Sequence, residues 1–164
     1  KYNLFCSKAL EQNKLYFYPL SSKVENKLEE IFKSLIGINK VKVNEIEILQ
    51  RKIKTVKSSK GVVWFDFKEI CDSPRSSLDY IEISKEFQTI IISNMFKIKS
   101  DDIARRFISL IDECYDRKVK VIISAENNFK EIYEGSNLKE KFKRTISRLI
   151  EMQSVDYLKE AHKA

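Results

Sequence analysis

Two short and almost purely apolar runs, residues 89–93 and residues 119–124, constrain the fold of this chain most. Both have the length of a strand, and a strand without alternating polar positions is typical of one that is buried on both faces of a sheet. Between them, Ser100 stands before two aspartates in the pattern that begins a helix. Apolar residues then recur at helical spacing: Ile103, Phe107, Leu110, Ile111 and Cys114. A strand, a helix and a strand in this order predict two parallel neighbours in one sheet.

The first part of the chain predicts a short strand followed by a helix. Residues 15–20 are apolar and aromatic, and Pro19 ends the strand because its ring cannot donate to a sheet. The segment from Ser22 to Glu25 has the pattern of a capping box, in which the side chains of the first and fourth residues satisfy free amides. Gly37 stands where a helix that begins there would end.

Alternating apolar residues then predict a small antiparallel β-hairpin set. Its first strand carries Val41, Val43, Ile46 and Ile48. The alternation slips at Asn44–Glu45, which indicates a turn or a bulge, and residues 53–56 and 61–67 complete the set. Ser77 can cap a further helix, and we predict a short and a long helix after the strand at 119–124. The predicted class is α/β: an antiparallel β-hairpin set plus a parallel strand–helix–strand unit, flanked by helices.

Composition bounds the architecture and excludes several kinds of site. With 164 residues, 43% of them hydrophobic, the chain suits one domain with one core. We divide it into residues 1–36, a basic β-rich segment at 37–67 and an α/β part at 68–164. Three cysteines lack a CxxC spacing and are expected as free thiols: Cys6, Cys71 and Cys114. With His162 as the single histidine, we predict no metal ligands and no catalytic residues.

The net charge of +7 is confined to one part of the sequence. Residues 1–60 hold thirteen lysines and arginines against six acidic residues, and the rest of the chain holds eighteen of each. We predict that Lys52, Lys54 and Lys57 bind an acidic surface of a protein or a membrane. The alternative is a solvated hairpin whose lysines bind nothing. Residues 33–63 contain no aromatic side chain to stack on a base, so we do not expect nucleic acid as a partner.

The segment FISLIDE, residues 107–113, imitates the acidic strand of many ATPases, in which apolar residues precede an Asp-Glu pair. A phosphate site also needs a glycine-rich loop that ends in Gly-Lys-Ser/Thr, and none of the chain's three glycines precedes such a pair. Apolar residues around FISLIDE repeat at three and four, which predicts a helix. Side chains of Asp112 and Glu113 would then point about 100° apart and could not hold one ion together.

Two polar groupings are candidates for binding. Arg144 and Arg148 stand one helical turn apart and would share a face, where guanidinium groups could sense a phosphate. Their alternative is a salt bridge to Glu140 or Glu151. Residues 124–127 follow a predicted buried strand at its C-terminal end, which is where α/β proteins form ligand sites, although a plain turn would look the same.

Spaced sequence blocks resemble a known family of ATPases. They are PRSSLDYI at 74–81, ARRFI at 104–108, SAE at 124–126, EIY at 131–133 and SRLIEMQS at 147–154. Through them nearly the whole chain resembles the C-terminal part of the ZapE cell-division ATPases and of their AFG-type mitochondrial relatives. The resemblance implies an AAA+-like P-loop ATPase that uses ATP and Mg²⁺. Such proteins act at the bacterial division ring under stress and, in mitochondria, in quality control of respiratory-complex subunits.

The resemblance also implies what these residues lack. The family's Walker A loop, Walker B strand and first sensor would lie upstream of Lys1, so we expect a C-terminal fragment in which residues 1–36 supply the last core strand and the start of a lid. Alone, the chain is expected to hold neither ATP nor Mg²⁺ and to be inactive. Arg148, with Arg144 beside it, is the candidate for nucleotide sensing or for contact between subunits. Expected partners are the upstream ATPase core, division-ring or membrane proteins and further copies of the chain, in the cytoplasm or at the periphery of the inner membrane.

Two functions therefore stay open. In the first, the chain is the C-terminal region of an ATP-driven remodelling protein. In the second, it is a stand-alone α/β interaction module whose basic N-terminal third binds acidic membrane or protein surfaces. A phosphate-binding loop encoded upstream would decide for the first.

Overall fold

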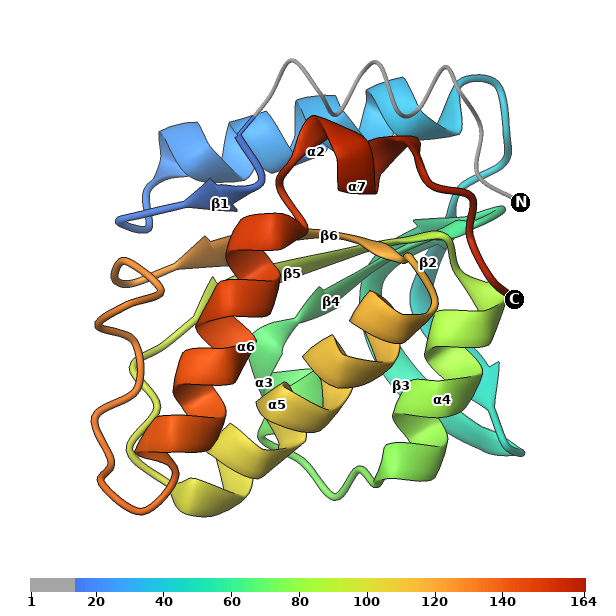
Figure 1. Ribbon diagram of the computed structural model, residues 1–164. Coiled ribbons are helices and arrows are strands. Elements are labelled where there is room, and N and C mark those ends of the chain that lie inside the picture. Colours follow the sequence, from blue (N-terminus) through green and yellow to red (C-terminus); the bar gives the residue numbers. More distant parts are fainter. Residues whose placement is uncertain (1–13) are drawn as a thin grey trace.

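The computed structural model describes residues 14–164 and is built around one six-stranded sheet (Figure 1). Its strands lie in the order β1-β6-β5-β4-β3-β2. Their bounds are β1 (Tyr16–Phe17), β2 (Lys42–Ile48), β3 (Arg51–Ser59), β4 (Val62–Asp66), β5 (Thr89–Met95) and β6 (Lys120–Ala125). Strands β1, β6, β5 and β4 are parallel, whereas the pairs β4–β3 and β3–β2 are antiparallel. The α/β class is confirmed, and β4 joins the hairpin set to the parallel unit in a single sheet.

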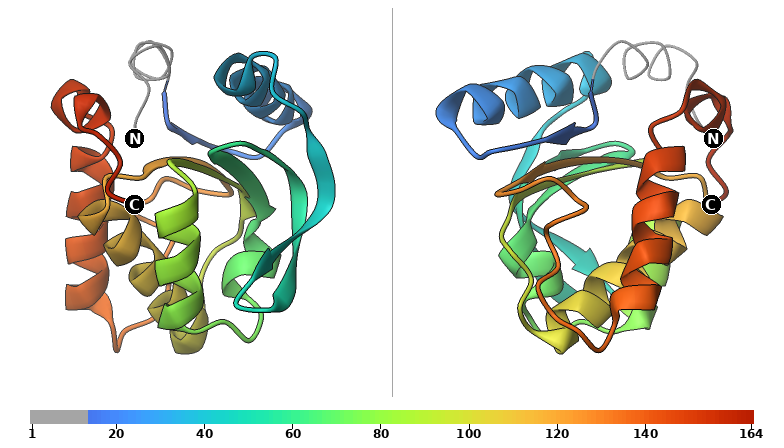
Figure 2. Two further views of the ribbon diagram at one scale, coloured as in Figure 1. Left: turned by 90° about the vertical axis from the view of Figure 1, so that its right-hand side faces the viewer. Right: turned by 60° about the vertical axis from the view of Figure 1, so that its left-hand side comes forward.

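Helices flank the sheet. They are α2 (Ser22–Ile36), α3 (Phe67–Cys71), α4 (Ser77–Glu86), α5 (Asp101–Asp116), α6 (Lys139–Glu151) and α7 (Val155–Lys159). In Figures 1 and 2, α4, α5 and α6 lie next to one another, and α2 lies away from them beside the upper end of the sheet. Phe32 of α2 packs near Trp64 of β4, with ring centroids 6.1 Å apart. In the part of the chain that the structure describes, no helix is long and apolar enough to cross a membrane.

The strand–helix–strand unit forms as predicted. Ile90 of β5 lies opposite Val121 of β6 in parallel register. The Ser100 side chain accepts a hydrogen bond from the Ile103 amide, and the predicted apolar stripe of α5 is buried. FISLIDE lies inside this helix, so it is not the strand of a nucleotide site.

Two helices begin one residue earlier than the sequence indicated. Ser21, rather than Ser22, caps α2 through a hydrogen bond from the Val24 amide. Ser76, rather than Ser77, caps α4, and Asp79 completes its capping box. In both cases two serines are adjacent, and the cap falls to the one whose backbone is extended. At the other end of α2, Gly37 adopts the predicted role with a φ of 57°.

The hairpin set contains the predicted irregularity. The β2–β3 register shifts between Val43 and Asn44, and Asn44 has a φ of 80°. Val56 of β3 is the extra residue at this point, so the irregularity is a β-bulge on β3 opposite the positive-φ residue of β2. The short helix expected after β6 is wrong, because residues 126–138 form a loop of turns and bends before α6.

Two of the three cysteines can be placed. Cys71 and Cys114 are free and fully buried, as core residues. Burial raises the pKa of both thiols well above its usual range, so they stay protonated and unreactive near neutral pH. Cys6 lies outside the described residues.

Candidate functional site

The two arginines singled out in the sequence meet on one carboxylate. Arg144 and Arg148 of α6 both donate to Asp112 of α5, Arg144 from Nη2 to Oδ2 at 3.2 Å and Arg148 from Nη1 to Oδ1. Their partner is therefore on the neighbouring helix, and neither Glu140 nor Glu151 is bridged to them. Sequence spacing could only suggest partners on the same helix, because the packing of α5 against α6 is a tertiary contact.

An aromatic ring extends this arginine cluster. The Arg148 guanidinium lies 4.7 Å from the centre of the Tyr115 ring, in the geometry of a cation–π contact. The Tyr115 hydroxyl donates to Glu151 Oε1 at 2.8 Å, and this hydrogen bond is the main reason why the pKa of Tyr115 is raised. Arg148 is thus held by a carboxylate and a ring, with 25% of its side chain exposed. Arg144 is held by the carboxylate and is 56% exposed.

This geometry leaves a positive surplus at the α5–α6 surface. One carboxylate, Asp112, serves two guanidinium groups, and each of these carries five N–H donors. Arg144 can offer its remaining donors to an anion or to an acidic side chain from outside, because it is the more exposed of the two. Arg148 is better placed to hold Asp112 and the two helices in position.

The three lysines predicted to form an acidic-surface site are not brought together. Lys52 and Lys54 point to the same side of β3, where Lys52 Nζ lies 3.4 Å from Glu45 Oε2 of β2. Lys57 points to the other side. There it pairs with Glu29 of α2, and its ammonium lies 5.3 Å and 5.6 Å from the ring centres of Phe32 and Trp64. Lys57 therefore fastens α2 to the sheet, and the role of the other two lysines stays a prediction.

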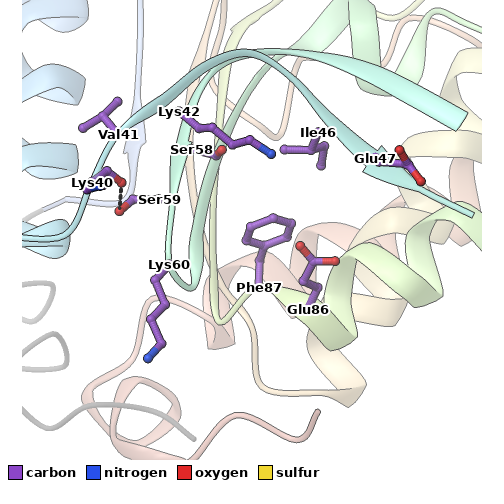
Figure 3. Close-up of a pocket in the computed structure, with 10 residues that line it drawn as sticks. All are labelled: Lys40, Val41, Lys42, Ile46, Glu47, Ser58, Ser59, Lys60, Glu86 and Phe87. Carbon is purple, nitrogen blue, oxygen red and sulfur yellow. Dashed lines mark hydrogen bonds between the residues drawn. The ribbon is translucent and has the colours of Figure 1, made fainter. Parts of the chain in front are cut away.

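A different set of lysines lines a pocket at the edge of the sheet. A pocket of about 450 Å³ opens between β2, the end of β3 and the end of α4. It is lined by Lys40, Val41, Lys42, Ile46, Glu47, Ser58, Ser59, Lys60, Glu86 and Phe87 (Figure 3). The Ser59 hydroxyl donates to the Lys40 carbonyl at 2.7 Å and fixes the rim. We call these ten residues the edge pocket.

The edge pocket has a basic and an acidic side. In Figure 3, Lys40 and Lys60 stand on one side of Phe87, and Glu47 and Glu86 stand on the other. Within residues 14–164, none of Lys40, Lys42 and Lys60 forms an ion pair, in contrast to Lys52 and Lys57. The sequence indicated excess charge in this region but could not tell free lysines from paired ones, because Glu29 reaches Lys57 only in the folded chain.

Polar residues at the C-terminal ends of the parallel strands bind one another. The Asn94 side-chain amide donates to Asp66 Oδ2 at 2.9 Å, and the Asn94 backbone amide donates to Ser124 Oγ at 3.0 Å. In the segment at 124–127, Glu126 Oε2 accepts from the Lys97 amide at 2.8 Å. These groups join the end of β5 to the ends of β4 and β6, and the loop after β5 to the loop after β6, so this segment has a structural role.

A comparison with known families identifies the chain. The model of the family described as AFG1-like ATPase matches residues 5–161. The chain belongs to the AFG1-like ATPase family. This confirms the resemblance drawn from the sequence blocks.

Several curated proteins resemble the chain along most of its length. Cell division protein ZapE of Escherichia coli (strain K12) is 36% identical over 160 residues, which is 96% of this chain and 42% of that protein. Uncharacterized protein C115.02c of Schizosaccharomyces pombe is 36% identical over 122 residues, which is 72% of this chain and 27% of that protein. Lactation elevated protein 1 homolog B of Danio rerio is 25% identical over 182 residues, 88% of this chain and 36% of that protein. The chain thus spans less than half the length of these curated relatives.

The family implies ATP and Mg²⁺ as cofactors of the whole protein, and the residues described here do not fit either. The three glycines are Gly37, Gly61 and Gly135, and none opens a phosphate-binding loop. Within residues 14–164 no group of three His, Cys, Asp or Glu side chains could hold a metal ion. Asp112 of the FISLIDE segment is occupied by the two arginines.

Proposed function

We propose that this chain is the C-terminal region of an AAA+-like ATPase of the ZapE type, acting in cell division or in protein quality control, with the phosphate-binding loop outside these residues. The observation that carries the proposal is the family match at residues 5–161. A second support is the 36% identity to a protein named for cell division. We also propose that the protein acts in the cytoplasm or at the periphery of the inner membrane. Its partners would be division-ring or membrane proteins.

Within this function we assign Arg144 and Arg148 to communication between the ATPase core and its surroundings. The support is the surplus of positive charge around Asp112. A nucleotide phosphate or an acidic residue of a neighbouring subunit would bind Arg144 and could compete with Asp112 for it. Breaking that contact would loosen α6 from α5, which gives ligand binding a structural consequence.

ATP turnover by the full-length protein tests this function. We expect hydrolysis by the full-length protein, none by residues 1–164 alone, and a loss of about tenfold or more in full-length Arg148→Ala. Arg105→Ala is the matched control, because Arg105 forms an exposed ion pair with Asp102 on α5. Turnover by residues 1–164 that survives Arg148→Ala would contradict both the proposal and the role of Arg148.

The edge pocket favours a second candidate function, a stand-alone interaction module that binds acidic surfaces. Its support is the set of lysines, Lys40, Lys42 and Lys60, that form no ion pair within the described part of the chain. The gene sequence upstream of Lys1 separates the two functions. A GxxxxGKS or GxxxxGKT loop supports the ATPase, and a gene without one leaves the module.

A further inference from the structure

We infer that the edge pocket binds an extended acidic segment of a partner protein, with a carboxylate at the lysines and an apolar side chain against Phe87. This inference gives a ligand class to the second candidate function, and it is also compatible with the first. Phe87 and Ile46 are almost fully buried and form an apolar floor. Lys40 and Lys60 lie on one side of this floor, and the Lys42 side chain extends above it towards Ile46 (Figure 3).

The arrangement of charges fixes the kind of ligand. A carboxylate next to the lysines would gain charge-assisted hydrogen bonds, whereas at the opposite end Glu47 and Glu86 would repel it. Burial raises the pKa of Glu86, while Lys42 acts on that carboxyl in the opposite direction, so Lys42 lies within electrostatic reach of both sides. A ligand that is acidic at one end and apolar in the middle fits this gradient better than a uniformly charged one.

The place of the pocket in the sheet favours an extended segment. Strand β2 is the outermost strand, and among the described residues it pairs with β3 alone. Val41, at the exposed end of the floor, is 48% exposed and its neighbour in the strand pattern, Val43, is 57% exposed, so apolar surface continues along this edge. The bulge at Val43 and Asn44 interrupts the regular ladder, so a guest strand would be recognised mainly through its side chains.

Two other occupants fit less well. A second copy of the chain that paired through β2 would present Lys42 as well as Glu45 and Glu47, so it would match the lysines of the pocket less well than a purely acidic segment. An anionic membrane would meet the exposed lysines, but the apolar floor lies inside a hollow that a flat surface does not enter. A protein segment satisfies both the charge and the shape.

Peptide binding by the folded chain tests the inference. The probe is a fluorescein-labelled Gly-Glu-Glu-Leu-Ser-Gly peptide, with Gln in place of Glu as the peptide control, followed by fluorescence anisotropy. The pocket variant combines Lys40→Gln, Lys42→Gln and Lys60→Gln. The matched control combines Lys23→Gln, Lys33→Gln and Lys159→Gln, three exposed lysines elsewhere on the surface with the same loss of charge. Thermal melting verifies that both variants fold.

We expect saturable binding of the acidic peptide that is about tenfold weaker in the pocket variant and nearly unchanged in the control. Val41→Ser, at the exposed end of the floor, should also weaken binding without unfolding the chain. If both triple variants lose the same amount of peptide affinity, net charge rather than the pocket causes the binding, and the inference is overturned. Absence of saturation up to about 1 mM peptide would overturn it as well. Binding to phosphatidylserine vesicles but not to peptide would replace it with a lipid surface. None of these outcomes affects the ATPase test, which does not use the pocket.

Discussion

Asp112 on α5 accepts a hydrogen bond from Arg148 on α6. The two residues lie on different helices, so their positions in the sequence do not predict this contact. The same carboxylate also binds Arg144, so one acidic side chain neutralises part of two guanidinium groups. Removing it would leave two adjacent guanidinium groups without a carboxylate partner, and Arg148 with the Tyr115 ring as its remaining contact across this interface.

We therefore expect Asp112→Ala to lower the free energy of unfolding by about 1–2 kcal/mol, between the values typical of exposed and of buried ion pairs. Urea denaturation measures it. Glu82→Ala, which removes an exposed pair with Lys85, should cost no more than about 0.5 kcal/mol. In a double-mutant cycle, Arg148→Ala should cost less once Asp112 is absent, and strict additivity would show that the pair is not coupled.

A second prediction concerns Lys120, whose ammonium is buried at the start of β6. It donates to three carbonyl oxygens, those of Lys118, Tyr157 and Glu160, and lies 4.7 Å from the centre of the Tyr157 ring. Lys120→Met would leave these carbonyls without this donor, and we expect a loss of about 2 kcal/mol in urea denaturation. The exposed Lys159→Met serves as control, and a cost no larger than that of the control would refute the structural role.

The pH dependence of Lys120 follows from its burial, which lowers its pKa to about 8. In the unfolded chain this lysine keeps its proton up to about pH 10. Between these values the unfolded state binds more protons, so Lys120 makes the folded state more stable as pH rises, by at most about 1.4 kcal/mol per pH unit. The difference in unfolding free energy between wild type and Lys120→Met, measured from pH 7.5 to pH 9.5, should grow with pH and isolates the lysine from the cysteines and tyrosines. A flat difference would contradict the depressed pKa.

A third prediction concerns His162, the only histidine in the chain. Its Nε2 lies 2.6 Å from the Ser84 carbonyl oxygen, and burial lowers its pKa. The folded state therefore favours the neutral ring, and acidification through the usual histidine range protonates the unfolded chain first and lowers stability. Wild type should lose more stability between pH 7.5 and pH 5.5 than His162→Gln. Parallel losses in the two proteins would mean that other groups cause the change.

The fourth prediction separates two adjacent serines. Ser21→Ala should destabilise the chain by about 1 kcal/mol, because it removes the cap of α2, whereas Ser22→Ala, inside the first turn, should change stability by only a few tenths. Thermal melting of the two variants compares them directly. The reverse order would restore the capping box that the sequence suggested.

Periodicity alone predicted the elements whose formation depends on burial. The two apolar runs form β5 and β6, and the apolar stripe of α5 is buried. An apolar pattern with the period of a strand or a helix can be buried as a whole only if the chain adopts that structure. The residue that caps a helix could not be predicted where two adjacent serines could both act as the cap, as at Ser21 and Ser22.

Pairings between distant residues could not be predicted. Asp112 was examined as a metal ligand and turned out to be a counterion, and Lys57 was grouped with Lys52 but reaches the opposite side of its strand. The sequence shows which residues are charged, but the neighbours that a charged side chain faces depend on how its strand or helix is packed. The edge pocket was hidden for the same reason, because Phe87 and Lys42 come together only when α4 ends beneath β2.

Strand β1 also sets an order for folding during synthesis. Tyr16 of β1 lies beside Ile123 of β6 in the sheet, yet the ribosome makes β1 before the other described strands and β6 after them. The β2–β3 hairpin can pair as soon as it emerges, whereas β1 must wait for β6 to appear. During that interval Tyr16 and Phe17 lack their final neighbour, so β1 is among the last of the described strands to join the sheet.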